Sequence, residues 1–218
     1  MTASPPSDPE SGPPARPATG RRRAAALPAL SIGGLDGVAP GTLLVAMPAL
    51  TEPTFAGTVV FVLDHSDSGT LGVVLGRPSQ VQIRDVLPGW SELAVDPGVF
   101  HVGGPCEADT ALCLAISPAP AGGGLRRVAG EVHLVDLDAD PAELHDQIAG
   151  LRVFAGYAGW AAGQLAGEIA EGAWACVPGR PDDVLTPVAG PALWRHVMGR
   201  QTGQLAVLST APADPSLN

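Results

Sequence analysis

Three short segments of the chain carry side chains of the kinds that enzymes use. The first is Asp64-His65-Ser66, which places an acid, a base and a hydroxyl side by side. A catalytic triad assembles in space from positions that are distant in sequence, and Asp and Ser are also common turn residues. The tripeptide therefore indicates a solvated hairpin turn in preference to a catalytic site.

The second segment is Gly103-Gly104-Pro105-Cys106, whose backbone N–H groups could face an anion and whose thiol could act as a nucleophile. It lacks the lysine and the hydroxyl residue of a phosphate-binding P-loop, and no clear helix start follows it. The alternative is a tight turn that holds two strands together, and we favour it. Gly103 and Gly104, with Arg77, are kept as candidate binding residues.

The third segment contains Tyr157, Trp160, Gln164 and Glu168. Gln164 and Glu168 are four residues apart, so their side chains converge on a helix, and the aromatic pair beside them could line a pocket. The alternative is that Trp160 packs in the core while Gln164 bonds the local backbone and Glu168 is solvated. We favour this structural role and assign no catalytic residue, but all four positions are kept as candidate binding residues.

Histidine and cysteine positions give no indication of a metal site. None of the five histidines stands at HxH or HxxxH spacing, and Cys106, Cys113 and Cys176 form no CxxC pair. An odd number of cysteines without such a pair argues against a disulfide framework and fits a reducing cytoplasm. We assign no metal ligand, and the sequence identifies no cofactor.

The charge of the chain restricts its partners. Its formal net charge is -10, and all twelve basic residues are Arg. Binding to a nucleic-acid backbone needs a basic face, so we do not expect the folded part to bind nucleic acid directly. No apolar stretch reaches the ~18 residues of a membrane-spanning helix.

The composition predicts one folded domain after a tail. Residues 1–25 are rich in Pro, Ala and Arg and are expected to form a disordered tail, followed by a linker over 26–39 and the domain over 40–218. The run Arg21-Arg22-Arg23 precedes a short apolar stretch and could belong to an export signal or a surface anchor. Pro28 interrupts that stretch, so a solvated basic patch is the favoured interpretation.

Local patterns predict many strands with few helices between them, which is typical of an α+β fold. The short polar connection between the second and third strands predicts an antiparallel hairpin, because a parallel crossover needs a dozen or more residues. Asp140 has the properties of a helix N-cap before Pro141. The expected strands cover 42–46, 58–63, 71–75, 112–116, 132–135 and 173–177, and the expected helices cover 83–87, 140–150 and 191–198. We predict a single domain with a mixed, mostly antiparallel sheet or partly closed barrel and helices packed on it.

The stretch from Tyr157 to Trp174 has the densest pattern in the sequence. A short strand over 153–155 leads to the glycines at 156 and 159, which predict a turn or a close backbone approach. Apolar residues at helical spacing then predict an amphipathic helix of about three turns from Ala161. Gly172 marks the expected stop of that helix.

This stretch, GYAGW followed by GQL and AW, resembles the YqgE/AlgH (UPF0301) family. The resemblance extends in the family's order over roughly residues 40 to 218. One departure is Gly76, because the family usually has Asn-Arg-Pro where this chain has Gly-Arg-Pro. The other segments that match are 41–48, 55–63, 69–75, 103–105 and 215–218.

The resemblance supports the same α+β shape and leaves three hypotheses for function. The first is a cytoplasmic protein without enzymatic activity that acts through a small ligand or a protein partner. The second is a transcriptional regulator, a label often given to relatives that resemble AlgH; regulation through a protein partner fits the acidic charge better than direct DNA binding does. The third is a small-molecule enzyme that uses the region of Gly103 or Trp160.

Overall fold

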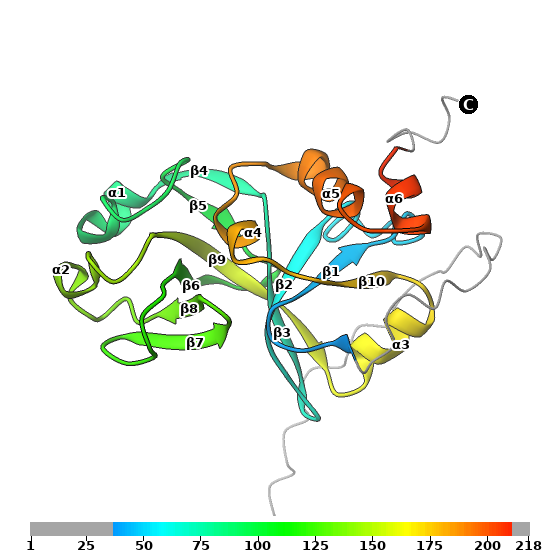
Figure 1. Cartoon of the computed structure of the whole chain (residues 1–218), viewed down its shortest axis with the longest axis horizontal. Coiled ribbons are helices and arrows are strands. Elements are labelled where there is room, and N and C mark those ends of the chain that lie inside the picture. Colours follow the sequence, from blue (N-terminus) through cyan, green and yellow to red (C-terminus); the bar gives the residue numbers. More distant parts are fainter. Residues whose placement is uncertain (1–36, 211–218) are drawn as a thin grey trace, which may run out of the picture.

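The structure is a computed structural model that describes residues 37–210 of the 218-residue chain. The expected tail over 1–25 and the linker residues before 37 lie outside the described residues. The described part is a single α+β domain in which a ten-stranded sheet curls strongly into a half-barrel, with helices around it (Figure 1). The predicted fold class is confirmed.

The strands follow one another around the half-barrel in the order β10-β1-β2-β3-β9-β6-β8-β7, and β5 lies beside β9 with β4 on its other side. All pairs are antiparallel except β5 with β9. The strands are β1 (Thr42–Ala46), β2 (Val59–Ser66), β3 (Gly69–Val74), β4 (Pro78–Gln82), β5 (Val99–Val102), β6 (Cys106–Ile116), β7 (Leu125–Ala129), β8 (Val132–Val135), β9 (Gly150–Ala161) and β10 (Trp174–Pro178). The helices are α1 (Ile83–Val86), α2 (Pro141–Leu144), α3 (Gln164–Ala170), α4 (Pro181–Leu185), α5 (Gly190–Gly199) and α6 (Gln204–Leu208), with a 3-10 turn η2 (Pro88–Trp90).

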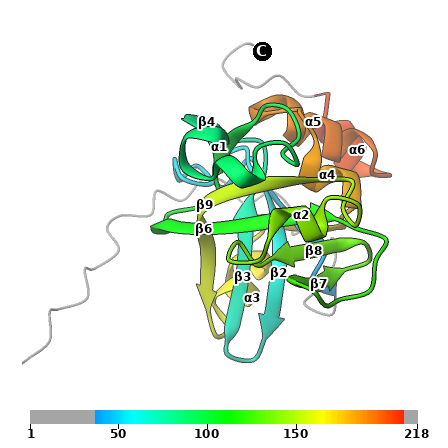
Figure 2. The same ribbon diagram turned by 90° about the vertical axis from the view of Figure 1, so that its left-hand side faces the viewer.

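Strand β9 joins the two halves of the sheet. Its C-terminal part pairs with β3, and its N-terminal part pairs with β6 (Figure 2). Of the turn or close backbone approach predicted at Gly156–Gly159, the turn is wrong, because β9 runs through both glycines without reversing. The close approach is confirmed at Gly156, where a Cβ would lie 2.7 Å from the Cys106 carbonyl oxygen. Gly156 has φ +71° and lies opposite a register shift in β6, so its conformational freedom serves a bulge between two strands.

The segments after β9 also differ from the prediction. Trp160 belongs to β9, and α3 is seven residues long, shorter than the predicted three turns.

Asp140 caps α2 by accepting a hydrogen bond from the Ala142 N–H at 2.9 Å, as expected, but the helix ends at Leu144. The tripeptide 64–66 lies in β2, so the predicted turn there shortens to two residues before β3. The antiparallel hairpin of β2 and β3 is confirmed.

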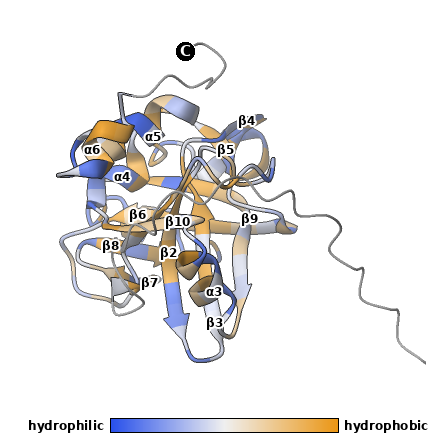
Figure 3. Ribbon diagram, turned by 90° about the vertical axis from the view of Figure 1, so that its right-hand side faces the viewer, coloured by the Kyte–Doolittle hydropathy of each residue, from blue (hydrophilic) through white to orange (hydrophobic). Residues whose placement is uncertain are grey.

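Apolar side chains on both faces of the strands hold the domain together. Along β1, Leu43 and Val45 belong to one cluster, with Phe154 and residues of α5, whereas Leu44 and Ala46 join a second cluster with Trp160 and the residues near α3. A third cluster lies beside α1 and α2. This two-sided burial explains the nearly continuous apolar strands in the sequence, and Figure 3 shows hydrophobic residues concentrated in the central strands. None of the helices within residues 37–210 is long and apolar enough to cross a membrane.

Candidate functional site

Gly103 and Gly104 lie where the connection from β5 to β6 crosses β9. The Gly103 N–H donates to the Ala155 carbonyl at 2.8 Å, and the Gly103 carbonyl accepts from the Val74 N–H at 2.7 Å. A Cβ at Gly103 would lie 2.2 Å from a backbone oxygen of β9, and a Cβ at Gly104 would lie 2.2 Å from the Tyr157 carbonyl. The two glycines thus permit a close contact between backbones.

Trp160 is buried and shares one hydrogen-bond acceptor with Trp174. The indole N–H groups of Trp160 and Trp174 donate to Oε2 of Glu168 at 2.9 and 2.8 Å. The Phe55 ring packs against both indoles, with ring centroids 5.9 Å from Trp160 and 5.6 Å from Trp174. The Glu168 carboxylate therefore compensates two polar groups that the aromatic packing removes from water.

Gln164 completes this network from the solvent side. Its Nε2 donates to Oε1 of Glu168 at 3.0 Å, so the predicted convergence of these two side chains is confirmed. Its Oε1 accepts from the Ala161 N–H at 3.0 Å at the end of β9. The side-chain hydrogen bonds of Gln164 and Glu168 go to Ala161, Trp160 and Trp174 and to each other, and they tie α3 to β9 and β10.

Arg77 follows the C-terminal end of β3, within electrostatic range of Glu52. Burial lowers the pKa of the Arg77 guanidinium, and the Glu52 charge opposes this shift. For Glu52, burial raises the pKa, but hydrogen bonds from Thr54 and Phe55, together with the Arg77 charge, leave it lowered. The Glu52 carboxylate, through its bonds to the N–H groups of Thr54 and Phe55, thus fixes the turn that carries the Phe55 ring, and Arg77 acts on it only through its charge.

Tyr157 marks a distortion at the beginning of β6. Cys106 pairs with Tyr157 and Ala111 pairs with Ala155, so four residues of β6 face one residue of β9. Glu107, in this bulge, has φ +44°, a left-handed conformation that costs energy in a residue with a side chain. A hydrogen bond with Glu107, burial and the negative charge of Glu107 raise the pKa of the hydroxyl of the half-buried Tyr157.

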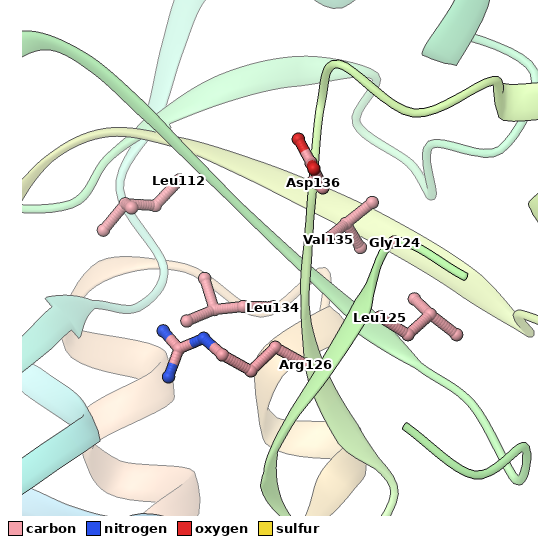
Figure 4. A pocket seen from close by; sticks show the side chains of 7 residues that line it. All are labelled: Leu112, Gly124, Leu125, Arg126, Leu134, Val135 and Asp136. Carbon is pink, nitrogen blue, oxygen red and sulfur yellow. The ribbon is translucent and has the colours of Figure 1, made fainter. Parts of the chain in front are cut away.

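A concavity of about 450 Å³ lies where β6, β8 and β7 pair with one another (Figure 4). Leu134 is opposite Leu114 in the pairing of β6 with β8 and opposite Arg126 in the pairing of β7 with β8. Since paired residues share a face of the sheet, Leu134 and Arg126 lie on the face that also carries Leu112. The lining residues are Leu112, Gly124, Leu125, Arg126, Leu134, Val135 and Asp136.

The polar rim of this concavity consists of two exposed, oppositely charged side chains, Arg126 and Asp136. Asp136 Oδ1 accepts a hydrogen bond from the Asp138 N–H at 3.0 Å. Within residues 37–210, Arg126 forms no side-chain hydrogen bond or ion pair. Its guanidinium is therefore available to a carboxylate outside the described part of the chain.

The backbone beside the concavity also has free hydrogen-bonding capacity. Strand β8 ends at Val135, opposite Cys113, whereas β6 continues to Cys106. On the side of β8, the described residues provide no strand partner for β6 over 106–111, and residues 107–111 are exposed. β6 thus lacks a partner on this side, next to an apolar hollow with charged ends, and this stretch includes the bulge of residues 107–110 opposite β9.

None of the seven candidate residues predicted from the sequence lines this concavity. The structure brings Trp160, Gln164 and Glu168 together, and it places Gly103, Gly104 and Tyr157 at the crossing of β5–β6 with β9. Arg77 belongs to a separate contact. Sequence reasoning missed Leu112, Arg126 and Leu134, for which the only indication was a glycine loop followed by two arginines.

Comparison with known proteins gives the family of the chain. The sequence model of a family described as AlgH-like matches residues 43–206. The chain belongs to the AlgH-like family. It is 50% identical over 183 residues to a UPF0301 protein of Streptomyces coelicolor, a match that covers 82% of this chain and 94% of that protein. It is 47% identical over 190 residues to a UPF0301 protein of Nocardia farcinica, with 85% and 88% covered.

Two solved structures resemble this AlgH-like chain. The crystal structure of protein DIP2367 from Corynebacterium diphtheriae has a TM-score of 0.74 at 35% identity and covers 80% of this chain and 93% of its own. The solution structure of the AlgH protein from Pseudomonas aeruginosa has a TM-score of 0.59 at 26% identity, with 80% and 95% covered. These similarities confirm the predicted family.

The titratable groups that this AlgH-like fold perturbs most are buried elsewhere. Burial, with the charge of Arg152, lowers the pKa of His101 to about 4, and burial lowers the pKa of Arg152 to about 10. Burial also raises the pKa of the Cys113 thiol, and it raises that of Cys176 to about 11. Arg152 donates to the carbonyls of Thr186 and Asp96, the latter at 3.0 Å, and so holds loops of the scaffold. No three His, Cys, Asp or Glu side chains cluster as metal ligands in the described range.

Proposed function

We propose that this AlgH-like chain is a non-enzymatic binding protein that takes an extended segment of a protein partner along the free edge of β6. The observation that carries this proposal is the unpaired edge over residues 106–111, which adjoins the concavity lined by Leu112 and Leu134. An added strand offers backbone hydrogen bonds for affinity, and hollows beside it select side chains. The edge of β6 offers the backbone groups, and the concavity beside it offers the hollow.

The concavity favours a particular kind of segment. Leu112 and Leu134 provide an apolar surface for an aliphatic or aromatic side chain of the partner. Arg126 suits an acidic side chain or a terminal carboxylate, because a guanidinium binds a carboxylate through two parallel hydrogen bonds. We therefore expect an extended segment with an apolar residue near an acidic one.

Binding is favoured over catalysis by the positions of the titratable groups. An active site generally gathers groups with perturbed pKa values in one cleft. The groups whose pKa is shifted furthest, His101, Cys113, Arg152 and Cys176, do not line the concavity. This observation supports a partner-binding role over the small-molecule enzyme.

The proposal includes the cytoplasm as the compartment and excludes direct binding of nucleic acid. Three free thiols, Cys106, Cys113 and Cys176, support a reducing compartment. The net charge of -10 disfavours a phosphate backbone, so a transcriptional role would act through a protein. Submicromolar affinity for a DNA duplex in a low-salt gel shift would contradict this part of the proposal.

A selection from a displayed library of random peptides tests the proposed function. We expect enriched peptides to combine an apolar residue with an acidic one and to bind the full chain. Leu112→Glu should abolish this binding, and Arg126→Glu should remove the preference for the acid. Arg195→Glu makes the same charge change at an exposed position of α5 and should leave binding unchanged. The absence of enriched peptides, or equal binding to wild type, Leu112→Glu and Arg126→Glu, would overturn the proposal.

A further inference from the structure

Strand β8 leads towards the stretch of β6 that lacks a partner. It runs antiparallel to β6, from Val132 opposite Ile116 to Val135 opposite Cys113. The stretch over 106–111 lies further along the same direction, so a strand added to this edge would continue the line of β8. Since β8 already occupies that line, a bound segment has to end beside β8 or turn away there.

The end of the added strand that meets β8 lies at Leu112. Ala111 and Leu112 both pair in register with β9, so β6 is a regular strand here, next to the bulge of residues 107–110. A residue opposite Leu112 shares its face of the sheet, as paired residues do. The first side chain of the segment therefore enters the apolar hollow between Leu112 and Leu134.

The charge at this end of the segment is negative. Asp136 directly follows Val135 at the end of β8 and lies exposed on the rim of the concavity (Figure 4). Its Oδ1 accepts a hydrogen bond from the Asp138 N–H at 3.0 Å, whereas within residues 37–210 its Oδ2 has no hydrogen-bond or ion-pair partner. A carboxylate attracts an ammonium group and repels another carboxylate, so an amino terminus is favoured at this position.

We propose that the segment bound along β6 is the free amino-terminal end of a partner polypeptide, with its α-ammonium group at Asp136. This inference rests on the proposed function, since it specifies the partner of the same site. The segment then runs antiparallel to β6, as β8 does, and its chain leaves the domain towards Cys106. Arg126 binds an acidic side chain of the segment, because the carboxyl end lies away from it.

The experiment uses a peptide enriched from a library displayed with free amino termini, synthesised once with a free and once with an acetylated amino terminus. Calorimetry measures the affinity of both forms for the full chain. Acetylation removes the charge and should weaken binding ~10-fold, as expected for the loss of one charge-assisted hydrogen bond. This difference should decrease above pH ~8, where a free α-amino group loses its proton. Equal affinities at pH 7, or tighter binding of the acetylated form, would overturn the proposal.

A pair of variants assigns the effect to Asp136. Asp136→Asn keeps an acceptor for the Asp138 N–H and removes only the charge, so it should weaken binding of the free form ~10-fold and leave the acetylated form unchanged. Glu131→Gln is the matched control, because it makes the same change at an exposed position before the other end of β8, and it should affect neither form. Equal weakening of both forms by Asp136→Asn would contradict a contact with the amine.

The two forms of the peptide also separate this inference from the proposed function. Equal binding of both forms to wild type, together with loss of binding in Leu112→Glu, would overturn the amino-terminal partner and leave the partner-binding function standing. The absence of enriched peptides would overturn both.

Discussion

Trp160 and Trp174 pack edge to face, with ring centroids 5.7 Å apart and an interplanar angle of 82°. They come from β9 and β10, strands that the sheet order separates by β3, β2 and β1. The curl of the sheet and the single acceptor Glu168 bring them together. This relationship explains why the GYAGW, GQL and AW motifs lie so close in the sequence: they form one structural unit.

Glu168→Ala should destabilise the domain by about 2–4 kcal/mol, because it leaves two buried indole N–H groups without an acceptor. Glu168→Gln retains an acceptor oxygen and should lose less. Gln164→Ala removes an exposed amide and should cost little. Urea unfolding, followed by tryptophan fluorescence, measures all three, and wild-type stability of Glu168→Ala would show that the carboxylate is not needed to satisfy the indoles.

Trp160→Ala should lower the free energy of unfolding by about 3–5 kcal/mol, a typical cost of removing a buried tryptophan. Its side chain is 5% exposed and contacts both Phe55 and Trp174. Such a loss is a large share of the ~5–15 kcal/mol that stabilises a domain. Calorimetric melting checks this. A variant that melts like wild type but fails to bind a ligand would make Trp160 a residue of a binding site.

Gly103→Ala should destabilise the domain by about 3 kcal/mol or more, because the new methyl group meets a backbone oxygen of β9 that cannot move alone. Gly167→Ala is the matched control. It lies in α3 with no other atom within 4 Å of the added Cβ, so it should stabilise the domain by about 0.5–1 kcal/mol. Thermal melting of the two variants provides the comparison; similar melting temperatures would contradict the close backbone contact.

His101 should make the domain less stable as the pH falls from about 6.5 to about 4. Burial and the charge of Arg152 lower its pKa to about 4 in the folded chain, against about 6.5 in the unfolded chain. Between these values the unfolded state binds more protons, so stability is fully present above pH 6.5 and decreases towards pH 4. The loss amounts to about 3 kcal/mol at most.

The comparison of wild type with His101→Phe isolates this effect from the carboxylates that titrate below pH 5. The phenyl ring keeps a contact with Phe154, which lies 5.9 Å from the His101 ring. The stability difference between the two proteins should change with pH between 4 and 6.5 and be constant above it. Urea titrations at a series of pH values measure this difference, and parallel curves would exclude a proton linkage at His101.

The sequence by itself determined the local elements and the family. Apolar runs predicted β1, β8 and β10 because strands buried on both faces need such residues. The spacing of Gln164 and Glu168 predicted their contact because it depends only on one helical turn. The motifs in family order likewise indicated the AlgH-like fold, because each motif matches the family within one short segment.

Only the tertiary structure decided the course of β9 and the position of the concavity. Glycines at 156 and 159 are compatible with a turn or a bulged strand, and the partners β3 and β6 select the strand. The concavity depends on where β8 ends against β6 and on which face Arg126 shares with Leu134. These relationships join segments that are distant along the chain, so no local pattern encodes them.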